Sequence, residues 1–418
     1  MKVLLIGHGC SPRHGSEPGA TWNWAWHLSM RNRVWLLAHP HERAAVEAFL
    51  GEHPNPNLRC CWVTPPGWLD PWNPRRGKRW IRLHYLLWQR AALHEAARLH
   101  QAEGFDIAHH VSWGSVSRPP LLWRLPIPLV WGPLGGGQVA PAAFRRYFGS
   151  SWMGESLRTA YVRMAARRPI LQKAAQRSAL LLATNHETAS LLESAGGRDI
   201  KLFLDSGLPD QFVPSRCPER KSGPLLKLLW AGRLEAWKCL PLALEAMSQV
   251  RDLPLRLLIA GDGPLRREWE ALAGRLGLGG KVAFLGQIPH AEMPALYRSA
   301  DAFIFTSLRD SFGAQVLEAM AAGLPIVTLD HQGAGAFVPS EAGIKVPVTL
   351  PEETVAGLAM AIRTLSASHE LRARMGRAGW RYAKTETWAR RVGKMNEWYE
   401  LVVSRQRSVP EARFAVAR

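Results

Sequence analysis

The chain has 418 residues, 47% of them hydrophobic and 21% charged, with a formal net charge of +19. This length predicts two domains rather than one, and the composition excludes an intrinsically disordered protein. The positive charge predicts affinity for anions. Charge by itself leaves nucleic acid, acidic lipid and phosphorylated ligands open as partners.

The cysteines and apolar runs indicate where the protein works. The five cysteines are odd in number and form no Cys-x-x-Cys pair, so we expect neither a disulfide framework nor a zinc site. We expect a reducing compartment. The first apolar run, residues 3–6, is too short for a signal peptide and reads as a buried strand. No stretch is long and uncharged enough to span a bilayer. We therefore expect a cytoplasmic protein.

Apolar runs of strand length alternate with amphipathic segments of helix length from the N-terminus onward. Strands are predicted at 2–7, 33–39 and 58–63, with helices at 21–30 and 41–50 between them. This alternation is typical of a parallel sheet covered by helices on both faces.

The same rhythm restarts after residue 222 and gives a second doubly wound unit. The predicted strands are 225–232, 255–261, 281–286, 301–307 and 325–330, and the predicted helices are 240–250, 264–277, 291–300 and 314–323.

The segment between the two units is rich in Pro, Ser and charge, which is typical of a linker. We therefore predict a first domain at 1–205, a linker at 206–222, a second domain at 223–385, and a C-terminal helix and tail at 386–418, with the helix packing back toward the first domain.

Three turns of the second unit follow predicted strands and carry groups suited to a phosphate ligand. Gly232 ends one strand and is followed by Arg233 and Lys238, the next strand runs into "GDGP" at 261–264, and a third runs into "RDSFGA" at 309–314. Ligands of open parallel sheets bind at the carboxyl ends of the strands, where glycine turns let helix N-termini approach phosphates. The sequence therefore predicts a site for a nucleotide diphosphate.

Each of these features also has an ordinary structural explanation. "GDGP" alone is a common turn, Arg233 and Lys238 could be solvated charges, Asp310 could cap a helix and Glu318 could lie on a solvated helix face. The functional interpretation is favoured because all of these residues fall at the same end of consecutive strands.

Taken together, the motifs resemble the retaining glycosyltransferases of family 4, which have the GT-B fold. Asp310 and Glu318 have seven residues between them and precede "AMAAGLP", as the two acids of that family's E-x7-E motif do, although the first acid is Asp here. In the first half, "GSEPGATWNWAWHL" (15–28), "DIAHHVSWGS" (106–115) and "PLVWGPLGGG" (128–137) are similar to a subgroup of the family.

The resemblance implies an α/β chain of two Rossmann-like domains facing across a cleft, and it implies roles for individual residues. Arg233 and Lys238 neutralise the departing phosphate, Asp310 meets hydroxyls of the donor sugar, Glu318 binds the nucleotide ribose, and His109 or His110 serves the acceptor side. The remaining donor-binding residues implied are Gly15, Gly19, Gly232, Gly261, Gly263, Phe312, Gly313, Ala314 and Gln315.

The implied chemistry needs no metal and no cofactor besides the nucleotide sugar. Breaking the bond to a diphosphate releases an anion, and the two permanent cations can stabilise it in place of a divalent ion. No Asp-x-Asp stands beside the glycine turns. Adjacent strand residues point to opposite faces, so we expect only one of His109 and His110 to reach a site, and the sequence does not say which.

The first half also predicts a membrane surface. Residues 67–99 combine tryptophans with many basic residues, and at helical pitch Ile81, Tyr85, Trp88, Ala92, Ala96 and Leu99 form one uncharged face, expected to be core. The opposite side mixes arginines with leucines, as an interfacial helix does, and 145–177 is a second basic tract. We expect peripheral attachment to the cytoplasmic face of a membrane and a lipid-linked or glycan acceptor. A solubilising basic surface is the alternative.

Three other functions compete with this interpretation. A dinucleotide-dependent oxidoreductase is disfavoured because residues 7–19 are too long and irregular for its Gly-x-Gly-x-x-Gly turn. A sugar-nucleotide epimerase shares the architecture and remains the nearest rival. A nucleic-acid-binding protein would explain the charge, but no recognised nucleic-acid module is present, so we expect no nucleic-acid partner.

Overall fold

The computed structural model describes residues 1–13, 15–72, 77, 79–219 and 223–407. Contacts within the chain divide them into two compact units. Unit 1 comprises Met1–Gly137, Met164–Ser206 and the chain from Trp388 onward, and unit 2 comprises Gln138–Arg163 and Gly207–Thr387.

Unit 1 is built on a seven-stranded sheet in the order β3-β2-β1-β4-β5-β6-β7, and every pairing is parallel. The order reverses between β1 and β4, which are paired directly. The strands are β1 (Lys2–Ile6), β2 (Arg33–Ala38), β3 (Leu58–Trp62), β4 (Ile107–His110), β5 (Leu129–Leu134), β6 (Leu180–Ala183) and β7 (Ile200–Leu202).

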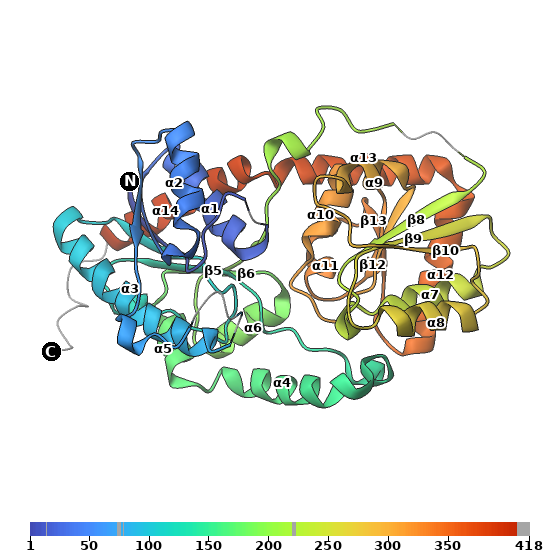
Figure 1. Cartoon of the computed structure of the whole chain (residues 1–418), viewed down its shortest axis with the longest axis horizontal. Helices are drawn as coiled ribbons and strands as arrows, with labels where there is room; N and C mark the ends of the chain where they lie inside the picture. Colours follow the sequence, from blue (N-terminus) through green and yellow to red (C-terminus); the bar gives the residue numbers. More distant parts are fainter. Residues whose placement is uncertain (14, 73–76, 78, 220–222, 408–418) are drawn as a thin grey trace. The chain divides into compact units, whose positions relative to one another are not determined.

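Helices cover both faces of this sheet (Figure 1). One hydrophobic cluster packs aromatic and aliphatic side chains of α1 and α14 against the sheet, and two others use α3, α5 and α6. The helices of this unit are α1 (Ser16–Ser29), α2 (Arg43–Glu52), α3 (Ile81–Glu103), α5 (Pro169–Arg177), α6 (His186–Ser194) and α14 (Trp388–Arg407).

Unit 2 is built on a six-stranded sheet, also parallel throughout, in the order β10-β9-β8-β11-β12-β13. Its strands are nearly continuous apolar runs because helices bury both faces. The strands are β8 (Leu226–Ala231), β9 (Leu255–Ala260), β10 (Val282–Gly286), β11 (Ala302–Phe305), β12 (Ile326–Leu329) and β13 (Gly343–Val346).

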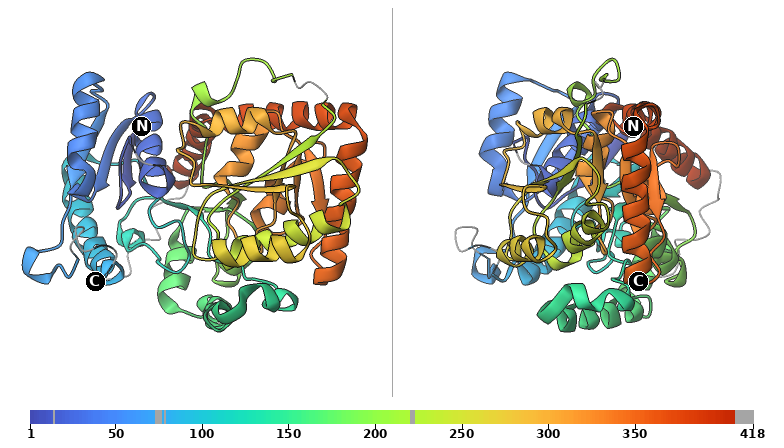
Figure 2. Two further views of the ribbon diagram at one scale, coloured as in Figure 1. Left: turned by 45° about the vertical axis from the view of Figure 1, so that its right-hand side comes forward. Right: turned by 90° about the vertical axis from the view of Figure 1, so that its right-hand side faces the viewer.

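The helices of unit 2 form two layers, with α7, α8 and α12 on one face of the sheet and α9, α10 and α13 on the other (Figures 1 and 2). They are α7 (Leu240–Gln249), α8 (Arg266–Arg275), α9 (Met293–Ser299), α10 (Ala314–Ala321), α11 (Gln332–Phe337), α12 (Pro351–Ala367) and α13 (His369–Thr385). Helix α4 (Trp152–Ala165) runs across the boundary at which the chain returns to unit 1. Short 3-10 helices lie at Pro40–Glu42, Gly67–Leu69, Leu122–Arg124, Ala142–Ser151, Asp210–Phe212 and Ala236–Lys238.

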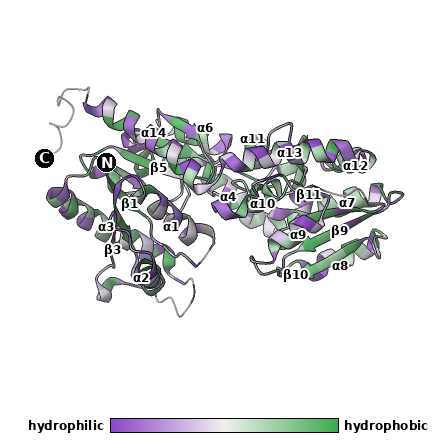
Figure 3. Cartoon of the chain, turned by 90° about the horizontal axis from the view of Figure 1, so that it is seen from above, coloured by the Kyte–Doolittle hydropathy of each residue, from purple (hydrophilic) through white to green (hydrophobic). Residues whose placement is uncertain are grey.

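The predicted fold class is confirmed, since both halves are doubly wound parallel sheets, each switching direction at its first strand. Hydrophobic residues mark the strands, and helices such as α3 carry both hydrophobic and hydrophilic residues (Figure 3). The predicted core face of α3 is buried at Tyr85, Trp88, Ala92, Ala96 and Leu99, whereas Ile81 is half-buried.

Two segments belong to a unit other than the one that precedes them in the sequence. Residues 138–163 lie in the middle of the first half and belong to unit 2, where Gln332 Nε2 donates to the Val139 carbonyl. Helix α14 follows unit 2 and belongs to unit 1. There Trp388 packs edge-on against Trp24, and the Arg391 guanidinium lies 4.0 Å from the centre of the Phe203 ring.

Candidate active site

Four loops meet at the carboxyl edge of the second sheet. They follow β9, β8, β11 and β12, which are consecutive neighbours in that sheet. The strand order reverses between β8 and β11, and ligands of doubly wound sheets bind at such a reversal. The glycine turns and the acidic residues singled out in the sequence all belong to these loops or to the helices that follow them.

The turns after β8 and β9 touch each other, and this contact requires glycine. A Cβ on Gly261 would lie 1.9 Å from the Gly232 carbonyl oxygen, and Gly261 has a φ of +133°. A Cβ on Gly263 would lie 2.6 Å from the Leu234 carbonyl oxygen. The Leu234 N–H in turn donates to the Asp262 carbonyl oxygen at 3.0 Å. The two turns therefore fix each other's position.

Lys238 and Asp310 form an ion pair across the point where the strand order reverses. The Lys238 ammonium, which follows β8, donates to the Asp310 carboxylate, which follows β11. The side chains are only 16% and 20% exposed. The Lys238 ammonium also lies 5.5 Å from the centre of the Phe305 ring. Lys238, predicted to meet the phosphate, and Asp310, predicted to meet the sugar, thus lie in contact with each other.

The backbone around Lys238 is fastened to the end of β11. The Trp237 carbonyl oxygen accepts from the Leu308 N–H at 2.8 Å and from the Ser307 hydroxyl at 3.1 Å. The Thr306 hydroxyl donates to the Lys238 carbonyl oxygen at 3.2 Å. These bonds fix the backbone from which the Lys238 side chain extends.

Arg233 differs from Lys238 in its surroundings. Its side chain is 74% exposed, and its guanidinium donates to the Glu235 carboxylate at 2.9 Å. An exposed pair of this kind holds a side chain weakly, so Arg233 can turn toward a ligand.

Helix α10 begins in the same loop cluster. Gly313 precedes it with a φ of +98°, and a Cβ there would lie 2.9 Å from the Phe305 ring. Phe312 is buried, while Ala314 is exposed and Gln315 half-buried. Within the described residues no side chain caps the first turn of α10. The first N–H groups of this helix can therefore bind an anion.

Glu318 lies on α10, one turn further along the helix. Its carboxylate accepts from the Tyr297 hydroxyl at 2.8 Å and from His290 Nε2 at 3.2 Å. This contact raises the pKa of His290 above its usual value of about 6.5, whereas burial and then the Glu318 charge raise the pKa of Tyr297 far above its usual value. Glu318 is thus a fixed acceptor and not a loose solvated charge.

Gln332 was not predicted, although it positions Asp310. Its side-chain oxygen accepts from the Asp310 N–H at 2.8 Å, and its φ is +51°. The next residue, Gly333, approaches the Ser311 carbonyl oxygen so closely that a Cβ would lie 1.5 Å away. The glycines that follow the predicted strand at 325–330 are the signal that could have revealed this fourth loop.

Of the first-half residues predicted to bind the donor, Gly15 is the exposed N-cap of α1 and Gly19 is buried within that helix. Both belong to unit 1, whereas the loop cluster described above belongs to unit 2.

His109 and His110, predicted to serve the acceptor side, are both buried at the end of β4. His109 is fully buried, with its Nδ1 2.5 Å from the Tyr399 hydroxyl and its Nε2 2.8 Å from the Gly132 carbonyl oxygen. Burial lowers the pKa of His109 to about 4 and that of His110, with a further contribution from His109, to about 3. Because helices cover both faces of the sheet, both rings are shielded from solvent.

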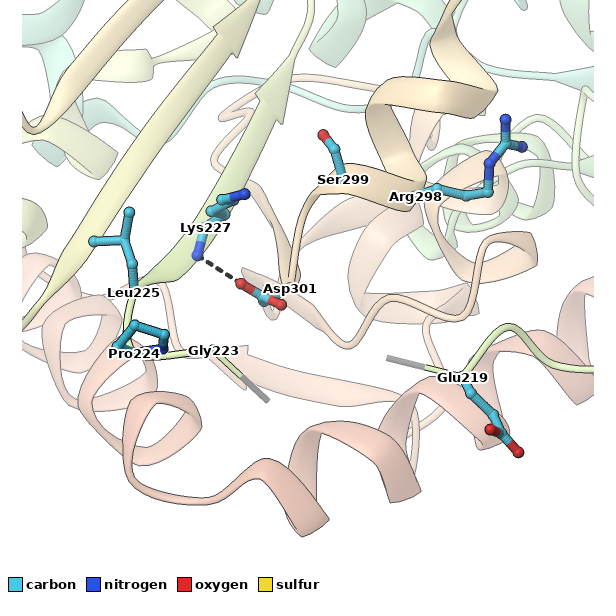
Figure 4. A pocket seen from close by; sticks show the side chains of 8 residues that line it. All are labelled: Glu219, Gly223, Pro224, Leu225, Lys227, Arg298, Ser299 and Asp301. Atoms are coloured by element: carbon cyan, nitrogen blue, oxygen red, sulfur yellow. Dashed lines mark hydrogen bonds between the residues drawn. The ribbon is translucent and has the colours of Figure 1, made fainter. Parts of the chain in front are cut away.

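A pocket of about 410 Å³ lies at the opposite, amino-terminal edge of the second sheet (Figure 4). Its wall includes Lys227 at the start of β8 and Asp301 before β11, and the Lys227 N–H donates to the Asp301 carboxylate at 2.8 Å. Ligands of doubly wound sheets bind at the other edge, so we assign the site to the loop cluster.

Comparison with known sequences agrees with this placement. Residues 217–381 match the profile of the family described as glycosyl transferases group 1. This segment, here named the group 1 domain after the matching profile, is similar to glycosyl transferases group 1. It contains the four loops, with Arg233, Lys238, Asp310 and Glu318.

Individual relatives match parts of the chain. The D-inositol 3-phosphate glycosyltransferase of Corynebacterium glutamicum is 28% identical over 42% of this chain and 44% of its own length. Glycogen synthase of Mycobacterium tuberculosis is 35% identical over 42% of each chain. An uncharacterised glycosyltransferase of Methanocaldococcus jannaschii is 39% identical over 24% of this chain and 26% of its own. The chain matches less than half of the length of each.

Solved structures match nearly the whole chain and show the fold. HepE of Anabaena, solved in complex with UDP, has a TM-score of 0.63 and 17% identity, covering 96% of this chain and 100% of its own. Sucrose-phosphate synthase of Thermosynechococcus elongatus has a TM-score of 0.65 and 17% identity, covering 97% and 99%. The group 1 domain is therefore one of two Rossmann-like units of a GT-B fold.

Proposed function

We propose that the chain is a retaining glycosyltransferase that moves a sugar from a nucleotide-diphosphate donor to a lipid-linked or glycan acceptor in cell-envelope synthesis. The observation that carries this proposal is the Lys238–Asp310 pair at the reversal of strand order, inside the group 1 domain. A cation for the phosphate and a carboxylate for sugar hydroxyls are needed side by side in such an enzyme.

The donor binds along the four loops. The turns at Gly232 and Gly261 and the N-terminus of α10 receive the diphosphate, since backbone N–H groups at a helix start favour negative charge. Glu318 accepts from the ribose hydroxyls. Asp310 accepts from the sugar hydroxyls once the diphosphate engages Lys238.

Catalysis relies on the stabilisation of the departing diphosphate. The bond between the anomeric carbon and the phosphate oxygen breaks, and the electron pair leaves with the phosphate. Lys238 and Arg233 stabilise that charge, and preorganised charges of this kind often make the largest catalytic contribution. The acceptor oxygen bonds to the anomeric carbon on the same face, and its proton passes to an oxygen of the leaving phosphate. The two cations replace a divalent metal at the phosphate.

A membrane location is supported by the exposed surface of α4. Its apolar side chains recur at intervals of three and four residues, so they share one helix face. These exposed side chains are Met153, Leu157, Tyr161 and Met164. Met153 is 74% exposed and Leu157 is 69% exposed. Exposed Arg163 and Arg167 lie on or next to this helix.

On α3, the exposed residues Arg82, Leu83, Leu86 and Arg90 repeat the combination of leucine and arginine. The neighbouring basic residues Arg75, Arg76 and Lys78, predicted to take part, lie outside the described residues. Among the described helices, none combines the length and hydropathy that crossing a bilayer requires. The arrangement fits peripheral binding to the anionic, cytoplasmic face of a membrane, where a lipid-linked acceptor is within reach.

The test is incubation of the chain with a panel of nucleotide sugars and lipid-linked or glycan acceptors. Glycosyl transfer predicts release of nucleoside diphosphate in proportion to glycosylated acceptor. Retention predicts that the product keeps the anomeric configuration of the donor, which NMR of the product measures. Isomerised donor sugar without net diphosphate release would identify an epimerase instead.

A further inference from the structure

A cluster of histidines in unit 1 takes no part in the function proposed above. His8 lies two residues after β1, His39 follows β2 directly, and His84 belongs to α3. Asp70 lies directly after the 3-10 helix at Gly67–Leu69. Because β1 and β2 are paired and parallel, the histidines after them lie at one carboxyl edge of the sheet.

The cluster is compact and largely closed to solvent. His8 is 6% exposed, His39 8% and His84 0%, and the Asp70 side chain is 18% exposed. The ring centres of His39 and His84 lie 4.9 Å apart, and those of His8 and His84 lie 5.1 Å apart. Trp72 covers the group, with its ring 4.7 Å from that of His84. Exposed, freely solvated histidines would not pack in this way.

Hydrogen bonds connect the members in a defined order. His84 Nδ1 lies 2.6 Å from the Asp70 carboxylate, and His84 Nε2 lies 2.9 Å from His8 Nε2. A neutral imidazole has one N–H and one lone pair. Without metal, His84 Nδ1–H donates to Asp70 and His84 Nε2 accepts from His8 Nε2–H. With a metal ion on Nδ1, the remaining proton lies on Nε2 of His84, which then donates to the Nε2 lone pair of His8.

We propose that His39, Asp70 and His84 bind a divalent transition-metal ion of the zinc class, with His8 as the outer hydrogen-bond acceptor of His84. The three ligand atoms lie within 4.8 Å of one another. Two imidazoles and one carboxylate are a ligand set of zinc sites that keep a fourth position open.

Small movements convert this cluster into a metal site. Zn²⁺ binds nitrogen and oxygen at about 2.0–2.2 Å, so neighbouring ligand atoms in a tetrahedral site lie about 3.3 Å apart. The 2.6 Å between His84 Nδ1 and Asp70 must therefore open by about 0.7 Å. His84 would then donate its other N–H to His8, and such an outer partner fixes the orientation of a metal-bound imidazole.

The three ligands are not equivalent. His39 Nδ1 accepts a 3.2 Å hydrogen bond from the His41 N–H, and that bond is lost whichever ring nitrogen binds the metal. The bond between His84 and His8, in contrast, is retained on binding. We therefore expect His39 to contribute less to metal affinity than His84.

The experiment is a titration of the untagged, chelator-treated full chain with Co²⁺, followed by visible absorption, and then displacement of Co²⁺ by Zn²⁺. We expect one ion per chain and the absorption of tetrahedral cobalt. Calorimetry with Zn²⁺ then compares the wild type with His84→Gln, Asp70→Asn, His39→Gln and His8→Gln. We expect the largest loss of affinity for His84→Gln, and a loss of about 10–100-fold for the outer partner in His8→Gln.

The matched control is His94→Gln, an exposed histidine on the same helix as His84, which should bind like the wild type. Unfolding midpoints without metal show which variants are folded, and Asp70→Asn, at the more exposed position, serves if His84→Gln does not fold. Absence of Co²⁺ and Zn²⁺ binding would overturn the proposal. So would unchanged affinity in folded Asp70→Asn and His8→Gln, or an equal loss in His94→Gln.

Discussion

Lys238 and Asp310 form an ion pair in the free chain, and in the proposed function both change partner when a diphosphate binds. The carboxylate holds the ammonium in place before the donor arrives, so little reorganisation is needed. Asp is one methylene shorter than the Glu of the family-4 motif, and here it lies within reach of Lys238 and is fixed by Gln332 through its own N–H. The shorter side chain is thus suited to the ion pair.

We predict that Lys238→Ala and Arg233→Ala each lower turnover by about 10²-fold or more, because each removes charge that faces the leaving phosphate. Arg233→Ala should leave the free energy of unfolding within about 1 kcal/mol of the wild type, since its pair is exposed. Nucleoside diphosphate release and thermal unfolding measure the two effects. The matched control is Arg256→Ala, an exposed arginine near the amino-terminal end of β9. Near wild-type turnover in both variants would contradict the donor site.

Glu318 makes a second prediction at this scale, through pH. Its contact raises the folded-state pKa of His290. The contact of protonated His290 with Glu318 therefore stabilises the folded chain fully below the pKa of an unfolded-state histidine, about 6.5. This stabilisation is lost as pH rises through the raised pKa of His290 in the folded state. The difference in unfolding midpoint between wild type and His290→Gln should shrink from about pH 5 to about pH 9. NMR titration should show the pKa of His290 falling in Glu318→Gln, and an unchanged value would rule out the contact.

At the scale of elements, the site depends on loops that touch one another through glycine. The turn after β9 rests on the turn after β8 at Gly261 and Gly232, and the turn after β12 rests on the turn after β11 at Gly333 and Ser311. Each contact is too close for any Cβ. A change in one of these turns is therefore expected to displace the turn that it touches.

We expect Gly261→Ala to lower the free energy of unfolding by about 1–3 kcal/mol and to weaken donor binding, because the new Cβ forces the two turns apart. Gly274→Ala on α8 is the control, since a Cβ there meets nothing within 4 Å and alanine favours helix by up to about 1 kcal/mol. Denaturant unfolding and calorimetry with nucleoside diphosphate measure both. Equal effects of the two substitutions would refute the loop contact.

Helix α4 carries the prediction on membranes. Wild type should float with vesicles of acidic phospholipid at low salt and dissociate as salt rises, because each nearby basic residue contributes about 1 kcal/mol and the Debye length is about 8 Å at physiological salt. Replacing Met153, Leu157 and Tyr161 with Ser should weaken flotation while donor binding persists. Met360→Ser on α12, an exposed methionine on another helix, should have no effect. Absence of flotation on acidic vesicles would favour a solubilising basic surface and a soluble acceptor.

At the scale of the whole molecule, the two proposed sites lie in different units. The proposed donor site, with Lys238 and Arg233, belongs to unit 2, whereas the histidine cluster belongs to unit 1. We expect that, after chelation, added Mg²⁺ or Mn²⁺ does not raise the rate of diphosphate release. A strict requirement for either ion would contradict the role given to Lys238 and Arg233.

The sequence by itself determined the fold class and indicated which of the candidate site residues lie at one edge of the second sheet. Apolar runs with glycine at their ends predict strand ends, and parallel strands bring their carboxyl ends to one edge, so Gly232, Lys238, Gly261 and Asp310 could be grouped without coordinates. Only the tertiary structure decided what each side chain contacts. The pairing of Lys238 with Asp310, the burial of His109 and His110, and the meeting of His39, Asp70 and His84 depend on the packing of segments distant in sequence. Sequence periodicity predicts which face of a helix or strand is buried, but it does not predict which residue of another element packs against that face.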